Sequence, residues 1–199
     1  DEAVKALGEA IRHAPAQRSI SLTFVDARDE AVKALGEAIR HAPALQSITL
    51  VFHKAISNEA AKALGEAIRH APALQSISLT FKWDTSDKAA KALGEAIRHA
   101  PALQSISLTF ESISDEAAKA LGEAIRHAPA LQSISLKLLD IRDDIMQALG
   151  EAIQHAPALR SISLESLALI SDDTGRTLAE AIRHAPALQS VSLKFRDIS

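Results

Sequence analysis

The stretch Leu121–Leu136, LGEAIRHAPALQSISL, is the clearest copy of a motif that recurs along the whole chain of 199 residues. The seven copies begin at Leu7, Leu35, Leu64, Leu93, Leu121, Leu149 and Leu178, so that neighbouring copies are 28 or 29 residues apart. A unit this short cannot bury its own apolar residues, and it must stack on its neighbours to do so. The repeat therefore predicts a solenoid.

Each unit has two parts with different apolar periods. In Asp115–His127, the residues Ala118, Leu121 and Ile125 recur at helical spacing, with charged residues on the other faces. In Leu131–Leu136, Ile134 and Leu136 alternate with serines, which is the period of a strand with one buried face. One helix and one short strand per unit, all running in the same direction, predict a parallel sheet with helices on one side.

The strand pattern Leu131-x-x-Ile134-x-Leu136 resembles that of leucine-rich repeats. The period and the alanine-rich helix narrow this resemblance to the ribonuclease-inhibitor-like subfamily, whose repeats also form the receptor domains of innate-immune sensors. The resemblance covers the whole chain and implies an α/β leucine-rich-repeat solenoid of seven repeats. It implies a curved horseshoe segment with the parallel β-sheet on the concave face and the α-helices on the convex face. We expect one array over 1–199, with repeats at about 1–28, 29–57, 58–86, 87–114, 115–142, 143–171 and 172–199.

The sequence departs from this family at one position. Family members carry Asn or Cys three residues after the last strand leucine, where the side chain bonds the turn backbone. That position here holds Val25, His53, Lys82, Glu111, Leu139, Leu167 and Arg196. One residue earlier stand Phe24, Phe52, Phe81, Phe110, Leu138, Ser166 and Phe195, a column that contains all five phenylalanines of the chain. Because the strand alternation points this column inward, we predict a stacked aromatic spine in place of an asparagine ladder.

The helix ends and one helix-interior column also carry predictions. Ser57, Ser86, Ser114 and Ser171 stand where N-caps are expected, and Asp29 and Asp143 are expected to serve in the same way. Each of the seven prolines follows an alanine and should end a helix there. One column of six glycines falls inside the predicted helices, where each costs about 1 kcal/mol relative to Ala: Gly8, Gly36, Gly65, Gly94, Gly122 and Gly150. We interpret this column as a place where neighbouring helices approach closely.

Composition limits the partners. The net charge of −3 gives no reason to expect nucleic acid or an anionic membrane. No run of 18 apolar residues and no signal-peptide pattern is visible, so we expect no membrane-spanning segment. The absence of Cys excludes disulfides and thiol chemistry, and it favours a cytoplasmic or a recombinant, designed protein.

The candidate protein-binding residues lie on the expected concave face. Its first two columns are nearly uniform Ser or Thr, whereas the third column varies: Thr23, Val51, Thr80, Thr109, Lys137, Glu165 and Lys194. At a strand spacing of about 4.8 Å, the three charged residues should form an alternating ladder. Trp83 completes the candidate set, either as an interface anchor or as a side chain packed partly against a neighbouring loop.

No residue pattern indicates chemistry. A histidine column recurs at the predicted helix ends: His13, His41, His70, His99, His127, His155 and His184. Helices that lie about 8–10 Å apart would hold these rings too far apart to share one metal ion, so we interpret them as complements to the helix dipole. No phosphate-binding loop, nucleophile elbow or carboxylate pair is present, and we expect no enzyme activity and no cofactor.

Two functions remain open from the sequence. The first is a structural scaffold, consensus-like and engineered, that associates with itself end to end. The phase match between the final Phe195–Ser199 and the initial Asp1–Ala3 supports this hypothesis, although Gln17 replaces the strand leucine of the other repeats. The second is a protein–protein interaction module, a fragment of a natural intracellular leucine-rich-repeat protein that binds another protein on the concave face.

Overall fold

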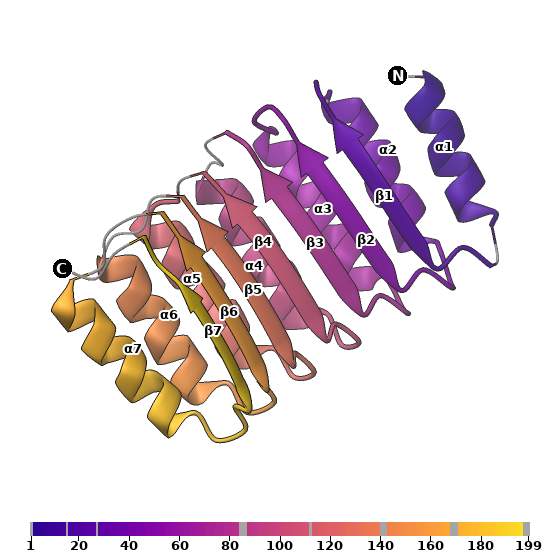
Figure 1. The fold of residues 1–199 in the computed structure, drawn as a ribbon. Coiled ribbons are helices and arrows are strands. Elements are labelled where there is room, and N and C mark those ends of the chain that lie inside the picture. Colours follow the sequence, from indigo (N-terminus) through magenta and orange to yellow (C-terminus); the bar gives the residue numbers. More distant parts are fainter. Residues whose placement is uncertain are drawn as a thin grey trace.

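Helices and strands alternate along the chain in the computed structural model, which describes residues 2–14, 16–26, 28–83, 87–111, 113–139, 143–167 and 171–196. The helices in these ranges are α1 (Glu2–Arg12), α2 (Asp29–Arg40), α3 (Asn58–His70), α4 (Asp87–His99), α5 (Asp115–His127), α6 (Asp143–His155) and α7 (Asp172–His184). The strands are β1 (Ser19–Phe24), β2 (Ser47–Phe52), β3 (Ser76–Phe81), β4 (Ser105–Phe110), β5 (Ser133–Leu138), β6 (Ser161–Ser166) and β7 (Ser190–Lys194). Each repeat thus contributes one helix and one strand, as predicted (Figure 1).

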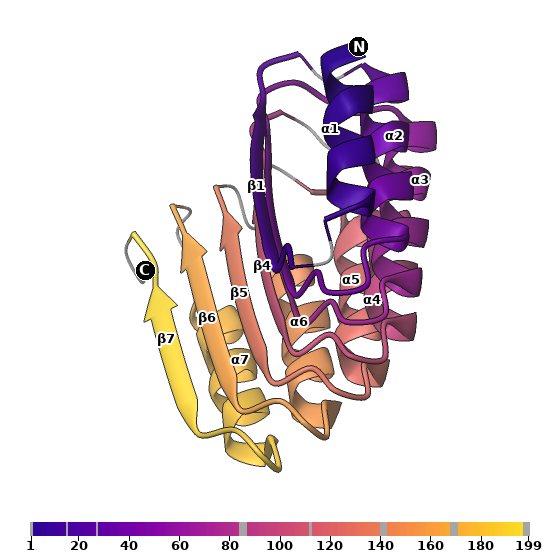
Figure 2. The ribbon, with the colours of Figure 1, turned by 90° about the vertical axis from the view of Figure 1, so that its right-hand side faces the viewer.

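The strands form one parallel sheet in the order β1 to β7, and the helices form a second layer on one side of it (Figure 2). The register keeps equivalent positions of successive repeats side by side, as in Ile77↔Ile106 and Leu108↔Leu136. Strands are about 4.8 Å apart, whereas packed helices are about 8–10 Å apart, so the helix layer is the wider one. The molecule is therefore a leucine-rich-repeat-like α/β solenoid, and we call the helix-free side of the sheet the concave face.

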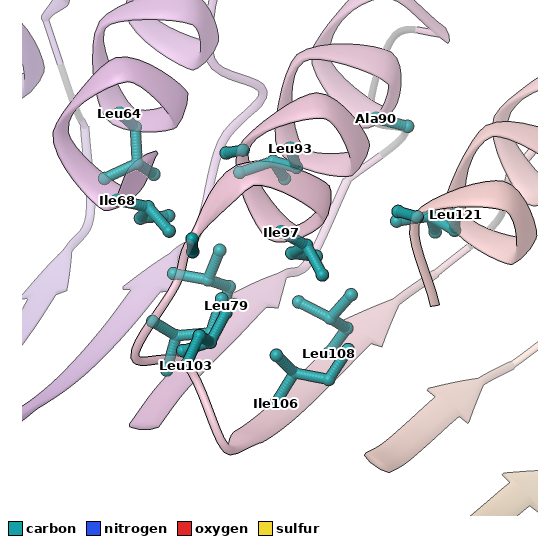
Figure 3. Close-up of a cluster of buried hydrophobic side chains, with 14 of the residues drawn as sticks. Leu64, Ile68, Leu79, Ala90, Leu93, Ile97, Leu103, Ile106, Leu108 and Leu121 are labelled. Atoms are coloured by element: carbon teal, nitrogen blue, oxygen red, sulfur yellow. The ribbon is translucent and has the colours of Figure 1, made fainter. Parts of the chain in front are cut away.

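The core lies between the two layers. In the fourth repeat, Leu93 and Ile97 of α4 pack toward Ile106 and Leu108 of β4, and all four side chains are at most 1% exposed (Figure 3). Equivalent leucines and isoleucines of the neighbouring repeats continue the same cluster. The core is thus one continuous layer that no single repeat could build alone.

The predicted aromatic spine is confirmed. Rings of Phe24, Phe52, Phe81 and Phe110 stack in series with centroids 5.3 to 5.4 Å apart and interplanar angles of 8 to 11°. Phe52 and Phe110 have no exposed surface, while Leu138 continues the column at 2% exposure. Stacked rings therefore fill the core one residue before the position at which leucine-rich repeats carry asparagine.

Backbone groups of the next repeat satisfy the turn carbonyls. The residue before each strand accepts hydrogen bonds from two successive N–H groups of the following repeat, at 2.8 Å and at 2.9 to 3.0 Å. These acceptors are the carbonyls of Arg18, Gln46, Gln75, Gln104, Gln132 and Arg160. Beyond the strand ends, the N–H groups of His53, Lys82 and Leu139 donate to the phenylalanine carbonyls of the preceding repeat. Main-chain hydrogen bonds between successive repeats therefore satisfy these carbonyls at both ends of the strand, without side chains.

The glycine column lies where neighbouring helices nearly touch. A Cβ built on Gly36, Gly94 or Gly122 would lie 3.0 Å from a main-chain carbonyl oxygen of the next helix. The partner in each case is the alanine two positions before the next helix's own column residue, for example Ala63 opposite Gly36. The predicted close approach is confirmed. It is looser at Gly150, where the methyl group of Thr177 replaces that of an alanine and the carbonyl lies 3.8 Å away.

The helix ends agree with the sequence at the serine caps. Ser57, Ser114 and Ser171 each accept a hydrogen bond from the N–H group three residues ahead, at 3.1 to 3.2 Å. The prediction for Asp29 was wrong, because Arg28 occupies the N-cap without a side-chain capping bond and Asp29 lies in the first turn. Its charge there still complements the helix dipole. Asp143 is likewise the first residue of its helix, α6, and not the residue before it. Ser86 and residues 140–142 lie outside the described residues.

Replacing Ser114 with Ala should lower the free energy of unfolding by about 1 kcal/mol, the usual cost of a lost N-cap. The reason is that the N–H group of Ala117 loses the acceptor it has at 3.1 Å. Urea denaturation of the purified chain measures the change. Ser114→Asp restores an acceptor and should recover most of the stability. An alanine variant as stable as the original chain would show that this cap contributes nothing.

Candidate protein-binding surface

The seven varying residues of the third concave column form one row across the sheet. Strand pairing aligns Thr23, Val51, Thr80, Thr109, Lys137, Glu165 and Lys194 in this order. In β2 to β6, buried residues alternate with half-buried residues that point to the concave side, and the row members in these strands belong to the half-buried set. Thr23 and Lys194, at the two ends of the row, are exposed. The structure thus brings all seven sequence-predicted residues of this column together on one face.

Charge enters this row only in its last three positions. The Nζ of Lys137 donates to Oε1 of Glu165 at 2.5 Å, and Lys194 is the next residue in the register. The hydrogen bond from Lys137 is the largest cause and lowers the pKa of Glu165. Desolvation opposes it, and the positive charges of Lys137 and then Lys194 add smaller lowering effects. The strand register therefore gives the predicted alternating order of charges, and an ion pair joins its first two members, Lys137 and Glu165.

We expect the carboxyl group of Glu165 to titrate below its usual pKa of 4.5. Because the folded state holds the lower pKa, the contribution to stability is present above about pH 4.5 and is lost as the pH falls through the folded pKa. An NMR titration of the Glu165 carboxyl carbon measures this directly. In Lys137→Gln the pKa should move back toward 4.5, and an unchanged value there would assign the shift to another cause.

Three large apolar side chains are exposed where strands end. Val25 follows β1 directly and is 70% exposed, Leu167 follows β6 and is 54% exposed, and Trp83 lies two residues after β3 and is 63% exposed. Since the strands are parallel, all three lie along one border of the sheet, which we call the carboxyl edge. Trp83 therefore lies beyond the end of β3, whose member of the row is the uncharged Thr80, and not within the row.

Val25 was not among the candidates from the sequence, whereas Leu167 begins an unusually apolar stretch, 167–170, for which the sequence leaves two interpretations open: loop packing or a small exposed apolar patch. Val25 and Leu167 occupy the position at which leucine-rich repeats carry asparagine, whose expected role is to bond the turn backbone. A usable signal existed, because the residue after an inward-pointing column should point outward by alternation. The apolar stretch that begins at Leu167 continues into residues 168–170, which lie outside the described residues.

A second inter-repeat ion pair lies on the same edge. The Nζ of Lys54 is 2.8 Å from Oδ2 of Asp26, and both side chains are largely exposed. The hydrogen bond and the positive charge of Lys54 lower the pKa of Asp26. An exposed pair of this kind contributes little to stability, and its main effect is to place fixed charges next to Val25.

The histidine column meets glutamates of its own helices. The Nε2 atoms of His13, His41, His70, His99 and His127 lie 3.1 to 3.5 Å from the carboxylate one turn earlier. In His155 and His184, Nδ1 instead lies 2.8 Å from a main-chain oxygen one turn earlier. Within the described ranges no group of three or more His, Cys, Asp or Glu residues is arranged to hold a metal ion.

The helix face carries shallow grooves between neighbouring helices. The larger, about 620 Å³, lies between α5 and α6, with Gly122, Ala148 and Ala152 in its lining beside Lys119, Arg126 and Glu151. A similar groove of about 550 Å³ lies between α3 and α4. Both linings combine Gly and Ala residues with Lys, Arg and carboxylate side chains. None of the described helices is both long and apolar enough to cross a membrane.

No protein-family model matches the chain, and no curated protein matches it in sequence. The fold does match solved structures. The C-terminal domain of tropomodulin from Caenorhabditis elegans has 15% identity and a TM-score of 0.50, with 92% of each chain covered. Actin-binding site 2 of leiomodin-1 has 10% identity and a TM-score of 0.50, with 89% of this chain and 86% of that one covered.

A chain in the yeast complex of Rad7 and Elc1 has 15% identity and a TM-score of 0.59. The match covers 96% of the present chain and 48% of that one, so the present chain spans about half of its length. At these identities the likeness shows the fold alone. It supports a repeat-solenoid fold for this chain.

Proposed function

We propose that residues 1–199 form one non-catalytic, protein-binding array of the ribonuclease-inhibitor-like type. The period of 28 or 29 residues and the full helix in every repeat support this subfamily. Two of the structural neighbours, leiomodin-1 and the Rad7–Elc1 complex, are named for binding other proteins, which supports a binding role for the fold. The partner is proposed to lie on the concave face.

The observation that carries the proposal is that charged residues interrupt an otherwise nearly uniform Ser and Thr surface on the concave face, at β5 to β7. Packing explains why the buried columns repeat, but it places no demand on half-buried positions that face solvent. Lys137, Glu165 and Lys194 depart there from the Thr and Val residues that fill the first four positions of the same row. Leu167, 54% exposed, lies at the adjoining carboxyl edge. An apolar side chain beside polar and charged groups is the usual make-up of a small protein interface.

The test is a binding comparison between two triple variants. The immobilised chain is used to capture a partner, and the partner is then purified. The affinity of the purified partner is measured for the original chain and for each variant. Replacing Lys137, Glu165 and Lys194 with Ala should weaken binding at least about tenfold, or 1.4 kcal/mol. The control replaces Ser105, Ser133 and Ser161 with Ala on the same face and should bind as the original chain does. Equal affinity of both variants would refute the assignment to this face.

A second candidate function is that of a structural scaffold that binds copies of itself end to end. The near-identity of the repeats supports a consensus-like, engineered sequence. The specific observation is β7, all of whose residues are exposed, with Val191 and Leu193 each at 40%. Light scattering over a concentration series tests this candidate. A strict monomer at about 100 μM, where weak association is already visible, would contradict it.

A further inference from the structure

Two complementary faces of the solenoid are open to solvent in this chain. Every internal repeat packs one face against the repeat before it and the opposite face against the repeat after it. Figure 1 shows α1 and β1 at one end of the stack and α7 and β7 at the other. The molecule therefore carries both halves of a contact that it makes internally at each junction.

The face of α7 and β7 carries the same kinds of residue as an internal junction between repeats, but no following repeat covers them in this chain. Val191 and Leu193 are 40% exposed, whereas their equivalents Ile134 and Leu136 in β5 are 2% and 4% exposed. The matching face of α1 and β1 shows the same loss of cover. Leu7 is 38% exposed there, against 2% for its equivalent Leu121.

The backbone of the two ends has the same complementarity. In each junction the carbonyl of the residue before a strand accepts two N–H groups of the next repeat. In β7 that carbonyl belongs to Gln189, and in β1 the corresponding N–H groups are those of Arg18 and Ser19. A second copy placed in the internal register would supply these donors and would lay Phe24 against Phe195, which is packed against the core at this end.

We propose that a second copy of this chain docks head to tail, with its β1 parallel to β7, and that Ala179 keeps this contact weak on the helix side. The inference rests on the second candidate function above. The partner is a second copy because the surface matches a junction already made within the chain. Such a contact is heterologous, so repeated docking produces a filament or a ring rather than a closed dimer.

Ala179 occupies the glycine column in α7. At five internal junctions, a Cβ in this column would lie 2.8 to 3.2 Å from the carbonyl oxygen of an alanine in the next helix. The equivalent alanine of a second copy is Ala6. A real Cβ on Ala179 therefore prevents α1 of that copy from reaching the internal helix spacing. The helices must stand farther apart, and the sheet edges then carry the contact.

Gln17 weakens the same contact from the other side. It is exposed and replaces a leucine that is at most 2% exposed in repeats two to six, for example Leu103. In a head-to-tail pair it would face Leu188 of the other copy, so less apolar surface is buried than at an internal junction.

Sedimentation velocity at about 1 to 100 μM tests the proposal on variants that change the size of the side chain at position 179. Ala179→Gly should associate at concentrations about tenfold lower than the original chain, and Ala179→Leu at higher ones. Leu193→Lys, which places a charge on the exposed face of β7, should abolish association. Thermal melts confirm that each variant is folded.

The outcomes test separately whether the chain self-associates and whether Ala179 weakens that association. If the original chain and all the variants are monomeric at about 100 μM, self-association itself is refuted. If the original chain associates and the residue at 179 has no influence, self-association stands and the role of Ala179 is wrong. If Leu193→Lys associates as the original chain does, the docking surface is not the face of β7.

Discussion

Phe110→Ala should lower the free energy of unfolding by about 3–5 kcal/mol, as truncations of buried phenylalanines do. The Phe110 ring has no exposed surface and stacks on Phe81 at 5.3 Å. Its removal leaves a cavity between Phe81 and Leu138 that main-chain ladders on both sides prevent from closing. The loss thus combines transfer, cavity and stacking contributions.

Urea denaturation with linear extrapolation measures this loss of stability. Two further variants serve as controls. Val25→Ala truncates a side chain that is 70% exposed at the same edge of the sheet and should change stability by less than about 0.5 kcal/mol. Phe110→Leu copies the residue that the next repeat has at Leu138 and should fall between the two. A loss below about 1 kcal/mol in Phe110→Ala would mean that the ring is not part of the core.

The repeat period predicted the architecture because it constrains every level at once. A constant period places equivalent residues side by side, so the register of Ile106 with Ile134 follows from the spacing alone. The alternation within each strand then placed the phenylalanine column inside and the third column outside. Both placements are confirmed by the stacked rings and by the row that ends in Lys194.

The parts that the sequence left open depend on main-chain geometry. The carbonyl of Gln104 accepts two N–H groups of the next repeat, yet nothing in the side chain of Gln104 signals this. The cap at Arg28 was missed for a related reason, because the helix begins at Asp29 without a side-chain acceptor before it.

At the carboxyl edge, strand alternation predicts that the residue after the phenylalanine column points outward, but it does not predict how much of that residue is exposed. Val25 and Leu167 leave 70% and 54% of their surface to solvent, because they follow the last paired residue of a strand and no repeating neighbour covers them. The charged row was within reach of the sequence because it belongs to the periodic part of the chain. The adjoining apolar residues belong to the part where the repeats differ.

Gly65→Ala should lower the free energy of unfolding by about 2 kcal/mol, although the same change in an ordinary helix raises it. A Cβ on Gly65 would lie 2.8 Å from the carbonyl oxygen of Ala92 and 3.4 Å from the carbonyl carbon. Main chain cannot swing aside as a flexible side chain can, so α3 and α4 must separate. Overpacking of this kind costs about 1–3 kcal/mol, which exceeds the gain of about 1 kcal/mol in helix propensity.

The same substitution in α7 provides the matched control. A Cβ on Gly175 meets nothing within 4 Å, so Gly175→Ala should raise the free energy of unfolding by up to about 1 kcal/mol. Gly150→Ala should lie between the two, since its nearest neighbours are side-chain methyl groups at 3.5 Å. Urea denaturation of the three variants should therefore rank Gly175→Ala above Gly150→Ala and Gly150→Ala above Gly65→Ala. If Gly65→Ala stabilises the chain as much as Gly175→Ala does, the two helices do not approach closely, and the steric role assigned to Ala179 fails with them.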